Sequence, residues 1–114
     1  DIQSQMDDLC EWMSEERGKY HPVEFAAHVH KKFVFIHPFK DGNGRVARLL
    51  MNTSLIQDGY LPALIPPVLR TEYISLLEKA REIDRPFIDF IIERAIESQK
   101  DFLRLLQVPL PENT

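Results

Sequence analysis

Apolar residues recur along this chain at steps of three and four positions, which is the spacing of one face of an α-helix. In residues 2–17 this spacing is met by isoleucine, methionine, leucine and cysteine, and polar residues fill most positions between them. Further stretches repeat the pattern, whereas none alternates apolar and polar residues over more than a few positions. The pattern therefore predicts an all-α fold of five to six helices around one hydrophobic core.

Glycine and proline residues mark the predicted helix boundaries. The predicted helices span residues 2–17, His21-Pro22 to Ile36, about Gly44 to Asp58-Gly59, Val68 to Ala80, and Asp84 to beyond Phe102. Asp84 is expected to cap the last helix, and the prolines between Tyr60 and Pro67 predict a loop. The length predicts one domain, with residues 1–107 as the core and 108–114 as an irregular C-terminal tail.

Composition narrows the classes of function. The formal net charge of -4 argues against a general nucleic-acid binder, which is usually basic. No apolar run approaches the ~20 residues that span a bilayer, so no membrane partner is expected. The single cysteine, Cys10, excludes an internal disulfide and favours a reducing compartment, so we expect a cytoplasmic location. Because the chain opens on Asp1 rather than methionine, we expect it to be part of a longer protein.

One stretch between the second and third predicted helices gathers most of the candidate chemistry: His37-Pro-Phe-Lys-Asp-Gly-Asn-Gly-Arg-Val-Ala-Arg48. Residues 41–44 tolerate left-handed backbone angles, and consecutive turns of that kind point backbone N–H groups at an anion. The helix that follows adds its positive N-terminal end. Arg45 and Arg48 lie three residues apart and should project from one face. We therefore expect a site for two or three linked phosphates.

Two further side chains of this stretch predict a reaction. Asp41 carries a negative charge into an anion site, which is costly unless the carboxylate binds a cation such as Mg²⁺ bridging it to phosphate oxygens. Histidine readily takes a proton from a hydroxyl at neutral pH, so His37 is the candidate base. Together these groups predict transfer from a nucleotide to a hydroxyl. Phe39 is expected to point back into the core and fix the loop.

This stretch resembles the full signature of the Fic-domain nucleotidyltransferases, His-x-Phe-x-Asp-Gly-Asn-Gly-Arg-x-x-Arg, at every defined position. The similarity covers nearly the whole chain, roughly from Ser4 to Leu106. The resemblance implies a Fic-like catalytic core with its active-site loop between two central helices. The activity that it implies is AMPylation, in which AMP moves from ATP to a Ser, Thr or Tyr hydroxyl of a target protein.

The resemblance also implies roles for single residues. His37 would be the general base and Asp41 the Mg²⁺ ligand, with ATP as the substrate. The phosphates of ATP would be held by Gly42, Asn43, Gly44, Arg45 and Arg48, with Arg45 at the β-phosphate and Arg48 at the γ-phosphate. A glycine at position 44 favours nucleotidyl transfer, because relatives with lysine there resemble the Doc toxin, which acts as a kinase.

Two features of the family find no match in this sequence. A β-hairpin flap usually precedes the core and aligns the target by strand addition, but the residues before His37 are predicted to be helical. The inhibitory helix is not matched either, since the similar stretch Ser54–Gly59 has aspartate for glutamate and lies in the active-site helix. We expect an inhibitory helix or an antitoxin-like partner upstream or on a separate chain, and self-association of the uncovered surface stays open.

Simpler interpretations compete for the signature residues. The loop alone matches a tight connection between two helices. His37 alone would be a capped core histidine, Asp41 could cap the third helix, and Arg48 could pair with a helix carboxylate. None of these accounts for all the residues of the signature together.

Outside the signature, several polar and aromatic residues carry weaker predictions. His28 and His30 point to different faces of one helix, so they are expected to be packing or surface residues and not a metal chelate. Asn52 lies one turn beyond Arg48 and is expected to brace the loop. The adenine pocket has no sequence signal, and Tyr60 and Tyr73 are its candidates.

For the chain as a whole, two classes of function remain open from sequence. The first is a protein adenylyltransferase, or a Fic enzyme that uses another NTP or CDP-choline or that removes AMP. The second is a nucleotide- or partner-binding module without transferase activity.

Overall fold

The structure is a computed structural model that describes residues 1–106. The predicted tail, residues 108–114, lies outside the described residues. The elements in chain order are α1 (Ile2–Glu16), α2 (Pro22–Ile36), α3 (Asn43–Gln57), the 3₁₀ turn η1 (Pro67–Leu69), α4 (Arg70–Lys79) and α5 (Arg85–Leu105). Within residues 1–106 there is no strand, and the predicted all-α fold is confirmed. No helix in this part of the chain combines the length and apolar content needed to cross a bilayer.

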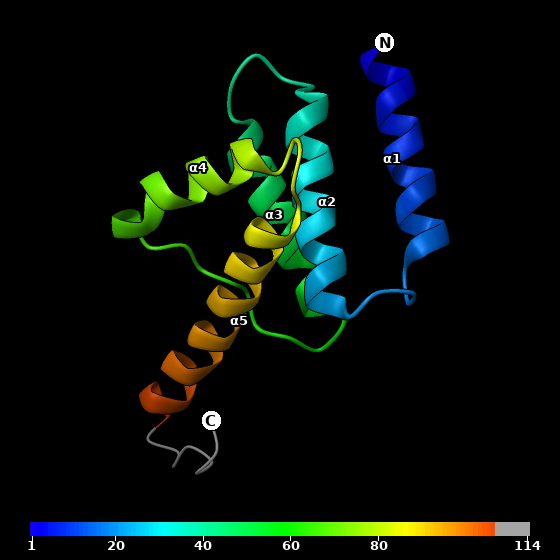
Figure 1. Cartoon of the computed structure of the whole chain (residues 1–114). Coiled ribbons are helices and arrows are strands. Elements are labelled where there is room, and N and C mark those ends of the chain that lie inside the picture. The colour runs from blue at the N-terminus through cyan, green and yellow to red at the C-terminus, as the bar shows by residue number, and fades with distance from the viewer. Residues whose placement is uncertain (107–114) are drawn as a thin grey trace.

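α2 is the central helix and packs against α1, α3 and α5 (Figure 1). Its start is fixed by Pro22 in the first turn and by His21, whose Nδ1 accepts the backbone N–H of Val23 at 3.2 Å. Seven of its 15 residues are buried, and six of these are apolar, so the helix is covered on several sides. The helix ends at Ile36, and the chain then turns sharply toward α3.

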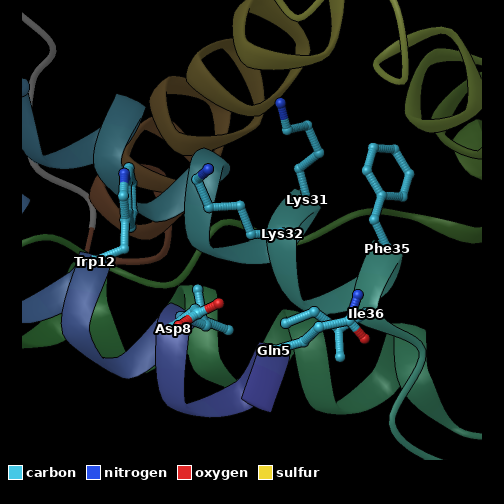
Figure 2. A pocket seen from close by; sticks show the side chains of 8 residues that line it. Gln5, Asp8, Trp12, Lys31, Lys32, Phe35 and Ile36 are labelled. Atoms are coloured by element: carbon cyan, nitrogen blue, oxygen red, sulfur yellow. The ribbon is translucent and has the colours of Figure 1, made fainter. Parts of the chain in front are cut away.

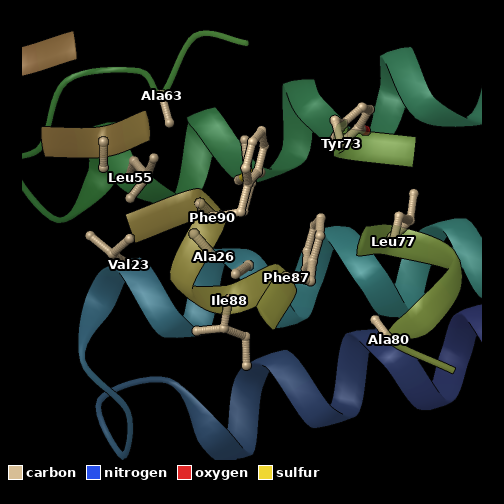
Figure 3. Packing of buried hydrophobic residues seen from close by; sticks show 14 residues of the cluster. Val23, Ala26, Leu55, Ala63, Tyr73, Leu77, Ala80, Phe87, Ile88 and Phe90 are labelled. Carbon is tan, nitrogen blue, oxygen red and sulfur yellow. The ribbon is translucent and has the colours of Figure 1, made fainter. Parts of the chain in front are cut away.

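The main core forms where α5 crosses α2 and α3, and Figure 3 shows Phe87, Ile88 and Phe90 of α5 within it. Phe87 is fully buried, and truncating such a side chain to alanine typically costs about 3–5 kcal/mol of unfolding free energy. A second, smaller cluster of Leu9, Phe33 and Ala47 joins α1, α2 and α3. Val34 packs against both clusters, so the single predicted core is two clusters connected through α2.

The helix starts differ from the predicted ones in local detail. α3 begins at Asn43, one residue before the predicted start. α4 begins at Arg70 and not at Val68, because residues 67–69 form a tighter 3₁₀ turn after Pro66. Asp84 precedes α5 as predicted, but its side chain makes no capping hydrogen bond. Its carboxylate pairs with Lys31 of α2 instead, so Asp84 ties α5 to α2.

Side chains of α3 and α5 hold the connection from α3 to α4. Asn52 of α3 accepts the backbone N–H of Ala63 at 2.8 Å. On α5, the Ser98 hydroxyl accepts the N–H of Leu64 at 3.0 Å, and Arg94 donates to the Leu64 carbonyl at 2.9 Å. Asn52 therefore braces this connection and not the His37 loop, which corrects the sequence prediction.

Candidate functional site

Residues 37–42 form the connection between α2 and α3. This loop lies at the opposite end of α2 from the connection between α1 and α2 (Figure 1). His37 ends α2 in a left-handed conformation, with φ 54° and ψ 57°, and its N–H reaches the carbonyls of Phe33 and Val34. A left-handed backbone costs a residue with a side chain about 1–2 kcal/mol. The imidazole of His37 is exposed, so this conformation turns the candidate base out of α2 and into solvent.

Asn43 holds the loop together from the first turn of α3. Its side-chain Oδ1 accepts the N–H of Phe39 at 3.0 Å, and its Nδ2 donates to the Phe39 carbonyl at 2.8 Å. Nδ2 also lies 3.1 Å from Nδ1 of His37 and 3.5 Å from its Nε2. Asn43 is 6% exposed, so these bonds are partly shielded from water. The loop is thus closed by one amide side chain.

Phe39 does not fix the loop through the core, as the sequence predicted. Its side chain is 53% exposed, with its ring 6.3 Å from that of Phe33. The prediction was wrong because Asn43 bonds to the backbone of Phe39, so the loop is held without burial of the ring.

The start of α3 leaves backbone donors free. Gly42 precedes the helix with φ 80° and offers no side-chain cap, and the first intrahelical bond is from Val46 N–H to the Gly42 carbonyl at 3.1 Å. The N–H groups before Val46 therefore lack an intrahelical acceptor, and an anion can accept from them. The predicted run of left-handed turns is reduced to Gly42, because Gly44 lies inside α3.

The two glycines make room for the two arginines. A Cβ on Gly42 would lie 3.0 Å from Nη2 of Arg45, and a Cβ on Gly44 would lie 3.3 Å from Nη1 of Arg48. Both guanidinium groups thus fold back over the glycine that lies three or four residues before them. This places both guanidinium groups beside the glycines at the start of α3.

Arg48 is half-buried and is held by Tyr73 of α4. Its Nη1 donates to the Tyr73 hydroxyl at 3.3 Å, and its Cζ lies 5.8 Å from the centre of the ring. No carboxylate within residues 1–106 forms an ion pair with Arg48, so the alternative pairing to a helix carboxylate is wrong. Arg48 and Tyr73 line a pocket of about 150 Å³ together with Arg70, which adds a third cation to this side of the loop.

A buried histidine stands behind Tyr73. His30 is 0% exposed, and its Nε2 lies 2.6 Å from the Tyr73 hydroxyl. Burial, reinforced by the charge of Arg48, lowers the pKa of His30 to about 3, and burial also raises the pKa of the Tyr73 hydroxyl. His28 lies on another side of α2, near Trp12 and Tyr20. Both histidines therefore pack against aromatic rings, as predicted.

Sequence reasoning did not find this contact between Arg48, Tyr73 and His30. The three residues come from three helices, and no local pattern pairs residues so far apart in the chain. A buried polar side chain needs a partner, but the sequence left open whether His30 is buried.

Asp41 lies exposed in the loop and makes no ion pair or side-chain hydrogen bond within residues 1–106. It does not cap α3, because Gly42 holds that position. In the same residues, no three potential ligand side chains gather into a cage. Mg²⁺ typically binds through one or two carboxylates plus substrate phosphates and water, so a lone carboxylate beside an anion site fits this ion.

A larger pocket lies apart from the signature residues. Figure 2 shows it between α1 and α2, where it encloses about 450 Å³. Apolar residues line one part of it and polar residues the other: Leu9, Trp12, Phe35 and Ile36, with Gln5, Asp8, Lys31 and Lys32. Neither arginine of the signature lines it. This pocket is therefore separate from the candidate phosphate site.

Of the two tyrosines considered for an adenine pocket, only Tyr73 lies near the loop. The Tyr60 hydroxyl is 3.4 Å from Nε2 of His21, at the start of α2. The His37 loop follows the end of that helix, about 22 Å away at 1.5 Å per residue.

Comparison with known proteins points to one family. The Fic/DOC family model matches residues 1–55, which include the whole signature. The curated protein adenylyltransferase Fic of Drosophila persimilis is 51% identical over 84 residues, or 72% of this chain, as is that of Drosophila mojavensis. The chain spans about a sixth of the length of these relatives, 16% and 17%.

Solved structures agree with the sequence relatives. A Fic-1 fragment from C. elegans superposes with a TM-score of 0.85 at 35% identity, covering 90% of this chain and 32% of that one. A Fic-domain-containing signalling protein from Bacteroides thetaiotaomicron gives a TM-score of 0.78 at 30% identity, covering 85% of this chain and 42% of that one.

Proposed function

Because this chain is a Fic-domain protein, we propose that it serves as the catalytic core of a protein adenylyltransferase that moves AMP from ATP to a hydroxyl side chain of a target protein. The observation that carries the proposal is the uncapped start of α3, which adjoins the loop of an exposed histidine and has two arginine guanidinium groups beside its glycines. An anion with several linked phosphates matches this arrangement better than any single carboxylate would.

In the proposed reaction, the target hydroxyl oxygen attacks the α-phosphorus of ATP. The bond from that phosphorus to the bridging oxygen breaks, and pyrophosphate leaves with the electron pair. His37 takes the hydroxyl proton, which makes it the catalytic base. A neutral imidazole has one lone-pair nitrogen, so that nitrogen has to exchange the nearby Asn43 amide for the hydroxyl as the target arrives.

The remaining signature residues bind the nucleotide in this proposal. The free N–H groups of residues 43–45 donate to oxygens of the α- and β-phosphates, and Arg45 and Arg48 neutralise the β- and γ-phosphates. Asp41 would hold Mg²⁺, which when bound supplies positive charge to the phosphate oxygens. Each of these assignments follows the family resemblance and is supported by the exposure and the placement of the residues in the loop.

The test is transfer of label from ATP with Mg²⁺, using the full chain and a lysate as source of targets. Label from α-labelled ATP that stays on protein, is absent from γ-labelled ATP, and is lost in His37→Ala supports nucleotidyl transfer. Label from the γ-position alone would show phosphoryl transfer and overturn the proposal. Binding of ATP without any transfer would favour the alternative of a nucleotide-binding module.

The same assay addresses the finer predictions. Competition by other nucleotides or CDP-choline ranks the donor, and release of AMP from a labelled target in water measures the alternative activity, hydrolytic removal of AMP. The target, an inhibitory helix or antitoxin-like partner, self-association and a cytoplasmic location stay predictions from the sequence.

A further inference from the structure

The phosphate site has a buried polar support that the signature does not include. Arg48 donates to the Tyr73 hydroxyl at 3.3 Å, and the same oxygen lies 2.6 Å from Nε2 of His30. His30 is fully buried, and its other ring nitrogen, Nδ1, has no hydrogen-bond partner within residues 1–106. A buried imidazole with a single polar contact is costly, so that contact calls for an explanation.

Counting protons assigns a direction to the two bonds. A guanidinium group only donates, so the Tyr73 oxygen accepts from Arg48. The Tyr73 proton then needs an acceptor, and Nε2 of His30 is the group within reach. The low pKa keeps His30 neutral at pH 7, which leaves one nitrogen free to accept. Nδ1 of His30 therefore carries the ring proton, and the chain of bonds runs from Arg48 through Tyr73 to His30.

The surroundings hold this chain of bonds in one geometry. The His30 ring packs edge-on to Tyr73 at 5.5 Å and against Phe87 at 5.2 Å. Tyr73 is 4% exposed and packs on Phe90 as well. No other titratable group shares this contact among the described residues, apart from Arg70, which faces Tyr73 from the start of α4. A buried, packed partner fixes a hydroxyl better than water would.

We propose that His30 is a positioning residue for the nucleotide site: it accepts the Tyr73 proton and so turns the Tyr73 lone pair toward Arg48, which holds the Arg48 guanidinium over the start of α3. The inference rests on the proposed function, because it assigns Arg48 to the terminal phosphate of ATP. Arg48 keeps its other N–H donors for that phosphate, since only Nη1 bonds to Tyr73.

The proposal predicts a selective loss of affinity. His30→Leu and Tyr73→Phe should each raise the Kd for ATP about three- to tenfold, the size of one hydrogen bond. The double variant should match Tyr73→Phe alone, because without the hydroxyl His30 has nothing to orient. Affinity for AMP, which lacks the terminal phosphates, should change by less than about twofold. His30→Gln should regain most of the ATP affinity, because its amide oxygen can accept the proton.

The molecule offers a matched control at the other end of α2. Tyr60 also points a hydroxyl at a histidine nitrogen, at 3.4 Å from His21, and it lies far from the loop. Tyr60→Phe should leave the Kd values for ATP and AMP unchanged. Calorimetry with Mg²⁺ and each nucleotide measures all the variants, and circular dichroism checks that each is folded. Equal losses for ATP and AMP, no loss in His30→Leu, or additive losses in the double variant would each overturn the proposal.

A nuclear magnetic resonance measurement separates this inference from the proposed function. Long-range ¹H–¹⁵N spectra of the unliganded chain should show His30 with a protonated Nδ1 and a bare Nε2. The Arg48 guanidinium should rotate slowly and should rotate faster in Tyr73→Phe. A protonated Nε2 would overturn the inference even if ATP binds, whereas failure of wild type to bind ATP, with these signals intact, would count against the proposed function alone.

Discussion

Each end of α3 carries a glycine with positive φ and an aspartate next to it, and an asparagine within the helix holds the connection on each side. Gly42 and Asp41 stand at the start, and Gly59 and Asp58 at the end, with φ of 80° and 85° at the two glycines. At the end of the helix, Asp58 is paired with Arg17 at 3.1 Å. At its start, Asp41 has no partner within residues 1–106.

The difference shows how to tell structural from functional polar residues in this fold. Asp58 joins the end of α3 to Arg17, which follows α1, and Asn52 holds the following connection. The start of α3 uses only the Asn43 amide for that purpose and leaves a carboxylate, a guanidinium, an imidazole and several N–H groups facing solvent. Residue types alone do not distinguish the two ends, whereas their partners do. Four pairs of substitutions test this distinction.

The largest effect is expected for the two histidines near the two ends of α3, His37 before its start and His21 beside the connection that follows its end. His37→Ala should lower the rate of AMP transfer by about 10²–10⁴-fold, because it removes the proposed base. The Kd for ATP should stay within about twofold. His21→Ala removes the cap of α2 and the contact with the Tyr60 hydroxyl, so it should cost about 1 kcal/mol of stability and leave the rate unchanged. Initial rates of label transfer measure both, and full transfer in His37→Ala would refute the assignment of the base.

The asparagines should differ in ligand binding more than in stability. Asn43→Ala breaks two bonds to Phe39 and should cost about 1–3 kcal/mol, with the Kd for ATP raised on the order of tenfold as the loop opens. Asn52→Ala breaks the bond to Ala63 and should cost about 1–2 kcal/mol of stability, with the Kd for ATP unchanged. Urea unfolding and calorimetry give the two quantities, and equal ATP affinities in the two variants would erase the contrast.

The aspartates test the metal assignment. Asp41→Asn should raise the Mg²⁺ concentration that gives half-maximal transfer on the order of tenfold, because the proposed ligand loses its charge. Its stability should stay within about 0.5 kcal/mol of wild type. Asp58→Asn loses a partly exposed ion pair and should cost up to about 1 kcal/mol without any change in Mg²⁺ dependence. The assignment fails if Asp41→Asn and wild type give the same Mg²⁺ titration.

The glycines give the smallest expected difference. Gly42→Ala and Gly59→Ala should each cost about 1 kcal/mol, because alanine is strained at positive φ. Nothing lies within 4 Å of a Cβ at Gly59, whereas a Cβ at Gly42 would meet Arg45 at 3.0 Å. Gly42→Ala should therefore also raise the Kd for ATP about two- to threefold. A similar rise in Gly59→Ala would show that backbone strain, and not the displaced Arg45, is responsible.

The sequence predicted the fold well because the helices are amphipathic and their ends carry glycine or proline. The His37 loop was located because its residues form one uninterrupted stretch. Predictions failed where the answer depends on a partner from another helix. Asp84 bonds to Lys31 and not to its own helix, and Asn52 bonds to Ala63.

Within the site, the sequence identified the residues but not their mutual contacts. Phe39 was placed in the core because aromatic residues are usually buried, but Asn43 already satisfies the backbone that Phe39 was expected to anchor. The sequence did not predict the hydrogen bond from Arg48 to Tyr73. Tyr73 lies on α4, and the position of α4 beside α3 depends on the course of the connection between the two helices. Such contacts follow from tertiary packing and have no period or spacing along the chain.

The loop that carries His37 is also the turn of the α2–α3 hairpin, and this has a kinetic consequence. α2 and α3 share the most extensive contact between any two helices described, and residues 37–42 alone join them. Short turns between neighbouring helices close in well under a microsecond, and local contacts form early in folding. We therefore expect the His37 loop to form in the folding nucleus, before α4 and α5 pack against α2 and α3 and before Tyr73 contacts Arg48. The candidate base would be in place first, and Arg48, the proposed contact of the terminal phosphate, would be the last part of the site to be ordered.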